Sequence, residues 1–130
     1  MSGEAATTFA KNSVKTVPKP WGYEIIWSHT ERYVGKVLHV NRGESLSLQY
    51  HEMKDETLYV IAGKVMLELE RGEERSSITL GVGEAFHVTP MTIHRIEAIE
   101  DTDIVEVSTP EIHDVVRLED RYGRAGTTEA

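Results

Sequence analysis

Short apolar runs, separated by turn residues, occupy most of the chain. Most of the runs are about four to eight residues long, are rich in Val, Ile, Leu and Tyr, and recur roughly every 8–12 residues. This spacing is typical of an all-β sandwich or barrel. The runs, each of which we expect to be a strand, are 23–27, 33–40, 46–51, 57–62, 64–69, 77–80, 85–88, 94–99 and 104–108.

Turn signals agree with this strand pattern. Glycine stands beside Asn, Arg or Val where a chain reversal is expected, as in Asn41-Arg42-Gly43 and Gly81-Val82-Gly83. The mostly charged stretch 70–75 predicts a solvated hairpin tip. No segment before residue 110 carries three turns of helical periodicity, and 111–121 has room for a single helical turn.

The two ends of the chain differ in composition from its middle. Residues 1–16 are rich in Ala, Ser and Thr without a sustained apolar period, which predicts a flexible arm or an extra strand ordered by a partner. Residues 125–130 are small and polar, and we expect a flexible tail there. The stretch 17–124 contains no internal repeat and no linker, so we expect it to form one β-barrel domain.

The net charge of the chain restricts the kinds of molecule that it is expected to bind. The 130 residues include 22 acidic and 14 basic side chains, which give a formal net charge of −8. This balance repels phosphate backbones and anionic lipid, so we expect no nucleic-acid or membrane partner, although local basic residues can hold a small anion. The absence of cysteine excludes disulfides and thiolate sites. Residues 1–15 lack a secretory pattern and no apolar stretch approaches ~20 residues, so a cytoplasmic protein is expected.

Four polar side chains indicate a metal site. Side chains on a strand alternate between its faces, so Gln49 and His51 share one face. Glu56 begins the next expected strand and can turn back beside them, and a later strand supplies His94. One amide oxygen, two imidazoles and one carboxylate make a ligand set for a borderline divalent cation. Each residue alone reads as an ordinary strand residue, so it is their spacing that favours a site.

That spacing resembles the two cupin motifs. The first motif is matched by Gly43, Gln49, His51, Glu56 and Gly63, which are separated by five, one, four and six residues. Gln49 stands in place of the first His of that motif. The second motif is matched by Gly83 and the block Thr89-Pro90-Met91-Thr92-Ile93-His94. In this block Thr89 stands at the Pro position of the motif and Met91 at its Gly position. The resemblance implies an antiparallel β-barrel, or double-stranded β-helix, of jelly-roll type. It also implies one divalent metal ion per chain in the mouth of the barrel.

Further sequence blocks make the chain similar to mannose-6-phosphate isomerases. Among these enzymes, it most resembles the cupin module of the type II group. That module is often fused to a sugar-1-phosphate guanylyltransferase. The resemblance spans about residues 18–124. The blocks that carry it are Pro20-Trp21-Gly22-Tyr23-Glu24, Leu46-Ser47-Leu48-Gln49-Tyr50-His51, His94-Arg95 and 114–124. Two features depart from the family: Lys54 stands where Arg is usual, and the 130 residues do not include the nucleotidyltransferase domain that we would expect beside the module. The resemblance implies aldose–ketose isomerisation of a phosphorylated sugar in carbohydrate metabolism.

Isomerisation requires a proton to move between adjacent carbons and the developing enediolate oxygens to be stabilised. A bound divalent ion supplies the stabilisation as a Lewis acid without a redox change. Because Gln is neutral and only one expected ligand is a carboxylate, the site would keep a net positive charge. The proton needs a general base within hydrogen-bond reach. His87, on the expected strand 85–88, is the candidate, against the alternative of an exposed strand histidine.

A sugar phosphate also needs cations to hold its phosphate. Our candidate substrate-binding residues are Arg95, Lys54 and Arg117, with Arg42 and Arg124 as further cations near the matched blocks. The alternative is that these side chains pair with Asp or Glu at the surface of an acidic protein. Arg117 and Arg124 have a second alternative, which is to dock the closing segment, residues 114–124, onto the barrel.

Apolar side chains beside the expected site indicate a protein partner. If Gln49 and His51 face the cavity, Leu46, Leu48 and Tyr50 share the opposite face, and three apolar groups on an outer face need a cover. The N-terminal strand or a second subunit would supply it, and we favour a homodimer. A second apolar stripe consists of Trp21, Tyr23 and Trp27. These rings can form a sugar-stacking face, but such a stripe more usually belongs to the core or to a subunit contact.

Three functions remain open at the level of the sequence. The first is the sugar-phosphate isomerase. The second is a cupin that binds a sugar or small acid without turnover, since metal ligands alone do not make a catalyst. The third is a dioxygenase using Fe or Mn, against which Gln49 counts, because such cupins usually keep three histidines. His, Glu and Gln suit Zn, Mn, Fe and Ni alike, so neither the metal nor the sugar is fixed.

Overall fold

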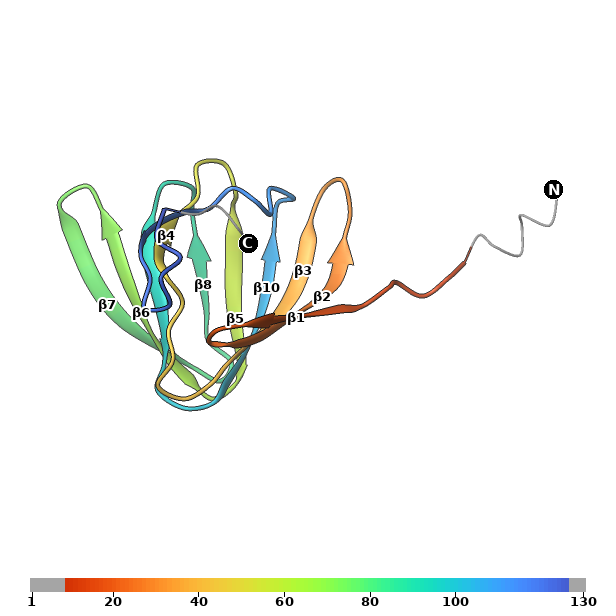
Figure 1. The fold of residues 1–130 in the computed structure, drawn as a ribbon, viewed down its shortest axis with the longest axis horizontal. Helices are drawn as coiled ribbons and strands as arrows, with labels where there is room; N and C mark the ends of the chain where they lie inside the picture. Colours follow the sequence, from red (N-terminus) through yellow and green to blue (C-terminus); the bar gives the residue numbers. More distant parts are fainter. Residues whose placement is uncertain (1–8, 127–130) are drawn as a thin grey trace.

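Eleven β-strands make up the computed structural model, which describes residues 9–126 (Figure 1). Within these residues there is no helix, and hence none that could span a membrane. The strands are β1 Lys15–Lys19, β2 Gly22–His29, β3 Val34–Val40, β4 Leu48–Tyr50, β5 Glu56–Ala62, β6 Lys64–Arg71, β7 Glu74–Gly81, β8 Ala85–Val88, β9 Ile93–Ala98, β10 Thr102–Ser108 and β11 Val116–Glu119.

The strands form two antiparallel sheets. One has six strands in the order β1-β2-β3-β10-β5-β8, and the other has five in the order β11-β4-β9-β6-β7. Figure 1 shows β6 and β7 of the five-stranded sheet on the left, and β5, β10, β3 and β2 of the six-stranded sheet toward the right. The sheets are not joined into a closed barrel, but the order is that of a jelly roll, which confirms the expected fold class.

The space between the sheets changes from apolar to polar along the strands. On β10 the buried positions run from Ile104 to Glu106, and on the antiparallel β5 they run from Val60 back to Glu56. Ile104 is the register partner of Val60, so the apolar positions lie together in one layer. The apolar core therefore fills one part of the space, and inward charged side chains fill the part where β5 begins.

Each of the nine runs predicted from the sequence contains a strand, and the 70–75 hairpin tip joins β6 to β7. The helical turn expected within 111–121 is wrong. Val116 and Arg117 instead pair with Tyr50 and Gln49, because β4 would otherwise leave its backbone groups unpaired at the edge of the sheet.

The N-terminal segment contributes an edge strand, since β1 pairs with β2 along its whole length. Of the arm expected at 1–16, residues 1–8 lie outside the described part, and residues 9–14 are exposed. Of the tail expected at 125–130, residues 127–130 likewise lie outside it. The domain limits 17 and 124 stay predictions.

Candidate metal centre

Both sheets contribute to a cluster of metal-binding side chains. Gln49 on β4 and His94 on β9 are register partners in the five-stranded sheet, so their side chains lie side by side on one face. His51 follows two residues after Gln49, just beyond the end of β4. Glu56 is the first residue of β5 in the opposite sheet, and so it meets the other three across the space between the sheets.

Two imidazoles and one carboxylate converge within this cluster. The Nε2 atom of His94 lies 3.2 Å from Oε1 of Glu56, and the Nε2 atom of His51 lies 3.6 Å from the same oxygen. The potential ligand atoms of the three residues all lie within 4.8 Å of one another, and all three residues are buried. This is the compact arrangement of nitrogen and oxygen donors that a divalent transition metal requires.

The hydrogen bonds behind the imidazoles fix which nitrogen faces the cluster. The Nδ1 atom of His51 donates to the carbonyl of Asp114 at 2.5 Å, and that of His94 donates to the carbonyl of Thr92 at 2.9 Å. A carbonyl oxygen only accepts, so each Nδ1 carries a proton and the Nε2 atom of each ring faces Glu56. A protonated Nε2 donates to the carboxylate and a deprotonated Nε2 binds a metal, so the donor set fits a divalent cation.

Asp114 also fastens the loop that carries His51. Its carboxylate accepts hydrogen bonds from the backbone N–H groups of Glu52, Met53 and Lys54, at 3.2, 2.7 and 2.9 Å. Its side chain and its carbonyl thus hold one short segment of chain from both directions. The residue belongs to the closing segment, 60 or more positions away in the sequence.

Gln49 lies at the edge of the cluster with its amide oxygen turned away. Its Oε1 accepts a hydrogen bond from Oγ of Ser47 at 2.5 Å, while its Nε2 lies 3.4 Å from Nε2 of His51. Ligation through oxygen requires the amide to turn over. The Ser47 hydroxyl can then accept from the amide nitrogen, because a hydroxyl both donates and accepts.

Lys54 balances the charge beside the cluster. Its ammonium lies 3.1 Å from Oε2 of Glu56 and 3.2 Å from Oε2 of Glu106, and all three side chains are buried. Burial alone would raise the pKa of Glu56, but the charge of Lys54 and hydrogen bonds from His51 and His94 hold it well below its usual range. Burial likewise opposes the charge on Lys54, yet Glu106 and Glu56 raise its pKa above the ordinary value. Glu56 therefore offers one oxygen to the imidazoles and the other to an ammonium.

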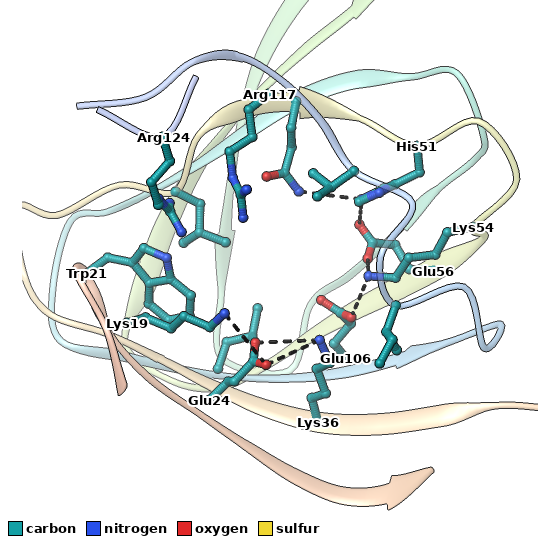
Figure 2. A pocket seen from close by; sticks show the side chains of 15 residues that line it. Lys19, Trp21, Glu24, Lys36, His51, Lys54, Glu56, Glu106, Arg117 and Arg124 are labelled. Atoms are coloured by element: carbon teal, nitrogen blue, oxygen red, sulfur yellow. Dashed lines mark hydrogen bonds and ion pairs between the residues drawn. The ribbon is translucent and has the colours of Figure 1, made fainter. Parts of the chain in front are cut away.

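A cavity between the sheets opens beside this cluster (Figure 2). It is lined mainly by β2, β3 and β10 on one side and by β4 and β11 on the other. Its charged lining comprises five cations, Lys19, Lys36, Lys54, Arg117 and Arg124, and three carboxylates, Glu24, Glu56 and Glu106. The lining is therefore positive in a protein whose net charge is −8. Such a cavity attracts anions.

Sequence comparison identifies the protein family of this chain. The family model "Mannose-6-phosphate isomerase C-terminal" matches residues 7–120. The chain belongs to this family. Mannose-1-phosphate guanylyltransferase ManC of Salmonella typhimurium is 36% identical over 115 residues, which make up 85% of this chain and 23% of that protein. The chain thus spans about a quarter of the length of the curated relatives it matches.

Solved structures place the chain among the cupins, as expected. KdgF from Halomonas sp. superposes with a TM-score of 0.62 at 26% identity, over 77% of this chain and 89% of that one. Bacillus subtilis oxalate decarboxylase, in a structure devoted to its Mn(II) centres, superposes with a TM-score of 0.65 at 15% identity, over 78% and 28%. The second likeness concerns the fold alone. The predicted resemblance to cupins is confirmed.

Two of the three expected substrate-binding residues reach the cavity. Lys54 lies beside Glu56, and Arg117 on β11 is the register partner of Gln49. Figure 2 shows the Arg117 guanidinium directed inward. Arg95 does not reach the cavity, because it follows the inward His94 and points to the outer face, where it pairs with Glu68 and Glu119.

The structure does not bring His87, the expected base, to the cavity. Val88 is buried in the core, so the preceding residue on β8 faces outward. His87 is exposed, and its Nε2 lies 2.6 Å from Oδ1 of Asp55. The alternative of an exposed strand histidine describes its position.

Two expectations about apolar side chains need correction. Leu46 lines the same cavity as Gln49 and His51 rather than sharing an outer face with Leu48, because it precedes β4 and escapes the alternation of that strand. Trp21, which precedes β2, is buried and lines the cavity. The other two members of its stripe, Tyr23 and Trp27, are each 37% exposed. A stacking face of all three rings is therefore not formed.

Sequence reasoning missed four charged residues of the cavity, namely Lys19, Glu24, Lys36 and Glu106. Each of the last three is a charge between uncharged strand neighbours, as in Ile104-Val105-Glu106-Val107. Charged residues in strands usually face solvent, so they attract no attention until the inward face is known. The signal that could have identified them is a charged side chain that shares, by strand alternation, the face of the buried apolar residues.

Proposed function

We propose that this chain is a metal-dependent isomerase that interconverts an aldose phosphate and a ketose phosphate, of the mannose-6-phosphate isomerase type. One observation carries the proposal: His51, Glu56 and His94 converge with both Nε2 atoms inward, at the edge of a cavity with more cations than carboxylates. Family membership supports the same chemistry.

The metal ligands in this proposal are His51, Glu56 and His94, with Gln49 as a fourth ligand after its amide turns over. A divalent ion at this position supplies Lewis acidity for the developing enediolate oxygens. The donor set suits Zn, Mn, Fe and Ni. One ion per chain is expected, because the described residues contain a single such cluster.

Proton transfer in this proposal falls to side chains of the cavity in place of His87. Glu106 is buried and lines the cavity, and its carboxylate is oriented by the Lys54 ammonium at 3.2 Å. A carboxylate held in this way is a general base that needs no reorganisation before it accepts a proton. We assign the base to Glu106, and we assign to Lys54 and Arg117 the neutralisation of anionic substrate oxygens.

Interconversion of mannose 6-phosphate and fructose 6-phosphate by the purified, metal-loaded chain tests the proposal. We expect turnover that stops on chelation and falls at least about 100-fold in His51→Ala, because a lost ligand removes the Lewis acid. His29→Ala, at an exposed histidine of β2, is the matched control and should retain activity. Fully metal-loaded protein that converts neither sugar contradicts the proposal. In that case, oxygen uptake with candidate diols would indicate the dioxygenase, and retention of an unreacted sugar would indicate a binding module.

The surrounding expectations follow from the same proposal. The substrate is a small phosphorylated sugar, and the net charge of −8 argues against nucleic acid and anionic lipid as partners. We place the function in the cytoplasm, because a doubly charged phosphate ester does not cross a bilayer unaided.

We further propose a homodimer formed through the outer face of the six-stranded sheet. Successive register partners give this face a continuous row of Ile25, Val37, Val105, Tyr59 and Ala85. Nearby Ile61 and Val107 are 45% and 47% exposed. Two carboxylates at this face have partners, since Asp103 lies 2.7 Å from His39 and Asp55 lies 2.6 Å from His87, and this limits repulsion between two copies.

The molar mass in solution tests this dimer. Light scattering should give twice the mass of the chain for the wild type, and Tyr59→Lys should give the monomer, because it places a charge in the centre of the apolar row. Val82→Lys, at an exposed residue between β7 and β8, is the control. A monomeric wild type at micromolar concentration contradicts the dimer and leaves the isomerase proposal intact.

A further inference from the structure

Strand β7 is the longest of the strands that lie at the edge of a sheet. The edge strands are β1, β8, β11 and β7, with five, four, four and eight residues. An edge strand exposes unpaired backbone groups, and proteins usually protect it by shortness, lysine, proline or a bulge. Strands β8 and β11 are short, and β1 carries Lys15, Pro18 and Lys19. The stretch 76–81 of β7 contains neither a charge nor a proline, so this edge lacks these protections.

The register of the β6–β7 hairpin shows which backbone groups of β7 are free. The residues on either side of its two-residue loop are paired, and the pair that closes such a loop is hydrogen-bonded. Bonding alternates along the strand, so the N–H and C=O groups of Arg75, Ser77 and Thr79 point away from β6. Within residues 9–126 no strand lies beside them. The next outward N–H, that of Gly81, is capped by Oε1 of Glu84 at 2.7 Å.

A pocket opens where β7 and β8 separate, and we call it the β7–β8 seam. Its floor consists of three half-buried apolar side chains that pack against the core, Leu69, Ile78 and Phe86. The two strands belong to different sheets and do not pair with each other. An extended segment laid along β7 would bond to its free backbone groups and cover this apolar floor.

The N-terminal arm, residues 9–14, is an extended segment without a strand partner. Asn12 Nδ2 donates to the carbonyl of Trp27 at 3.1 Å, and the other side chains of the arm have no hydrogen bond within residues 9–126. Phe9 is 91% exposed and Val14 is 62% exposed. Burial of a phenylalanine ring is strongly favourable, so an arm that holds Phe9 in water gains free energy from a place to bury it.

The arm does not reach the seam of its own copy. Strand β1 is the edge of the six-stranded sheet opposite to β8, and Figure 1 shows the arm leading away on the side opposite to β7. Its six residues extend over only about 20 Å. In the homodimer proposed above, a two-fold axis along the strands lays β1 of one copy over β8 of the other, because these are the two edges of the sheet that forms the interface. The seam of the second copy then lies beside the arm.

The charges of the arm and of the seam are complementary. The arm carries Lys11 and no carboxylate. Two carboxylates line the seam, and of these Glu70 pairs with Arg75 at 3.4 Å, while Glu74 is exposed and has no ionic partner within residues 9–126. The cation that lines the seam, Arg71, is held by two threonine hydroxyls. The charge left for Lys11 is therefore that of Glu74.

We infer that the arm of each copy enters the β7–β8 seam of the other copy and pairs antiparallel with β7. The inference rests on the proposed homodimer and not on the isomerase activity. The register places Phe9 opposite Ile78 and Lys11 opposite Ser76. Side chains alternate along both strands, so Phe9 covers the apolar floor and Lys11 lies diagonally beside Glu74.

Disulfide trapping tests this pairing, and the absence of cysteine from the chain means that only introduced thiols react. Lys11→Cys and Ser76→Cys are purified separately and mixed, so a bond between the two positions joins two copies. Opposite residues that share no hydrogen bond lie about 4.5 Å apart at Cα, which suits a disulfide. After mild oxidation, mass spectrometry should find the peptide that links positions 11 and 76.

Ser77→Cys is the matched control for this trap, because it lies on the same strand with its side chain on the other face. Mixed with Lys11→Cys, it should link at least about ten-fold less, since the Cβ vectors point apart. Absence of the 11–76 link, or an equal yield with Ser77→Cys, overturns the inference.

The dissociation constant of the dimer, from light scattering over a dilution series, is a second test. Phe9→Ala should raise this Kd at least about ten-fold, because it removes a buried ring from each copy. Met53→Ala is the control, since Met53 is also an exposed apolar side chain and lies outside the arm and the seam. Metal content and turnover should stay unchanged in Phe9→Ala.

The outcomes separate the arm exchange from the proposals on which it builds. If Phe9→Ala and Met53→Ala have the same Kd, the arm exchange is wrong and the dimer through the six-stranded sheet stands. A monomeric wild type contradicts both the dimer and the arm exchange. Neither result affects the isomerase proposal, because Phe9 lies outside the metal cluster and the cavity.

Discussion

His51 and His94 are oriented by different means. The Nδ1 atom of His94 donates to the carbonyl of Thr92, two residues away in the same chain segment. The Nδ1 atom of His51 donates to Asp114, whose position depends on the closing segment. Either hydrogen bond leaves Nε2 able to bind a metal, so the two rings are equivalent as ligands although their supports are not.

Metal analysis of single-residue variants tests this cluster. Wild-type protein should hold about one divalent ion per chain, and His51→Ala or His94→Ala should hold almost none, because one imidazole, one carboxylate and the weak amide donor are too few for tight binding. Gln49→Ala should retain the ion with an affinity lowered about 10–100-fold, since a neutral amide is the weakest of the four donors. His29→Ala is the control, and undiminished metal in both histidine variants would refute the site.

Lys54 tests the electrostatic balance beside the same cluster. Lys54→Met leaves the buried carboxylates of Glu56 and Glu106 without their shared ammonium. Removal of one partner from a buried ionic group costs about 3–5 kcal/mol, so we expect a loss of that order in the unfolding free energy from urea titration. Lys64→Met is the exposed control. A loss below about 0.5 kcal/mol would show that water reaches these carboxylates and that the group is not buried as described.

At the scale of strands, alternation accounts for most of what the sequence predicts. The runs of Val, Ile and Leu mark the strands, and the spacing from Gly43 to Gly63 marks where Gln49, His51 and Glu56 enter the site. Alternation does not say which face is inward, and this is why His87 was a candidate base although it faces outward. Strand β11 was missed because a short polar strand forms only when an open edge is available to pair with it.

The closing segment after β11 supplies a test with pH. Burial would raise the pKa of Asp120, but hydrogen bonds from Arg124 and the charges of Arg124 and Arg117 lower it below its ordinary value. A carboxyl whose folded-state pKa is lowered stabilises the fold above its unfolded pKa, and this stability is lost as the pH falls through the folded value. The difference in unfolding free energy between wild type and Asp120→Asn should therefore be full near neutrality and should shrink as the pH falls below about 4. Glu31→Gln is an exposed control, and a difference independent of pH would contradict the ion pair with Arg124.

At the scale of the whole molecule, the metal cluster connects two sheets that no strand joins. His94 belongs to the five-stranded sheet and His51 extends from it, while Glu56 belongs to the six-stranded sheet. A bound ion would hold both sheets at once, close to the place where the space between them becomes polar. The family resemblance gave the ligands, but this bridging role follows only from the topology, because sequence spacing does not say which strands share a sheet.

Chelation tests this bridging role. An ion that binds the folded chain alone adds about 2.7 kcal/mol at a concentration 100 times its Kd. Removal of the ion should therefore lower the thermal midpoint by several degrees, by an amount that depends on metal concentration. His51→Ala, which cannot bind the ion, should show no such shift. An equal shift in this variant would mean that the chelator acts elsewhere.

The two contacts of Asp114 have a consequence for the order in which the protein is made. During synthesis the strands that carry His51, Glu56 and His94 leave the ribosome before Asp114 does, so the ring of His51 and the 52–54 loop have no anchor at that stage. Only Asp114, which follows these ligands in the sequence, fastens them. A nascent chain that stops short of Asp114 would carry every ligand yet bind metal loosely, and translation itself thus delays tight metal loading until the domain is nearly complete.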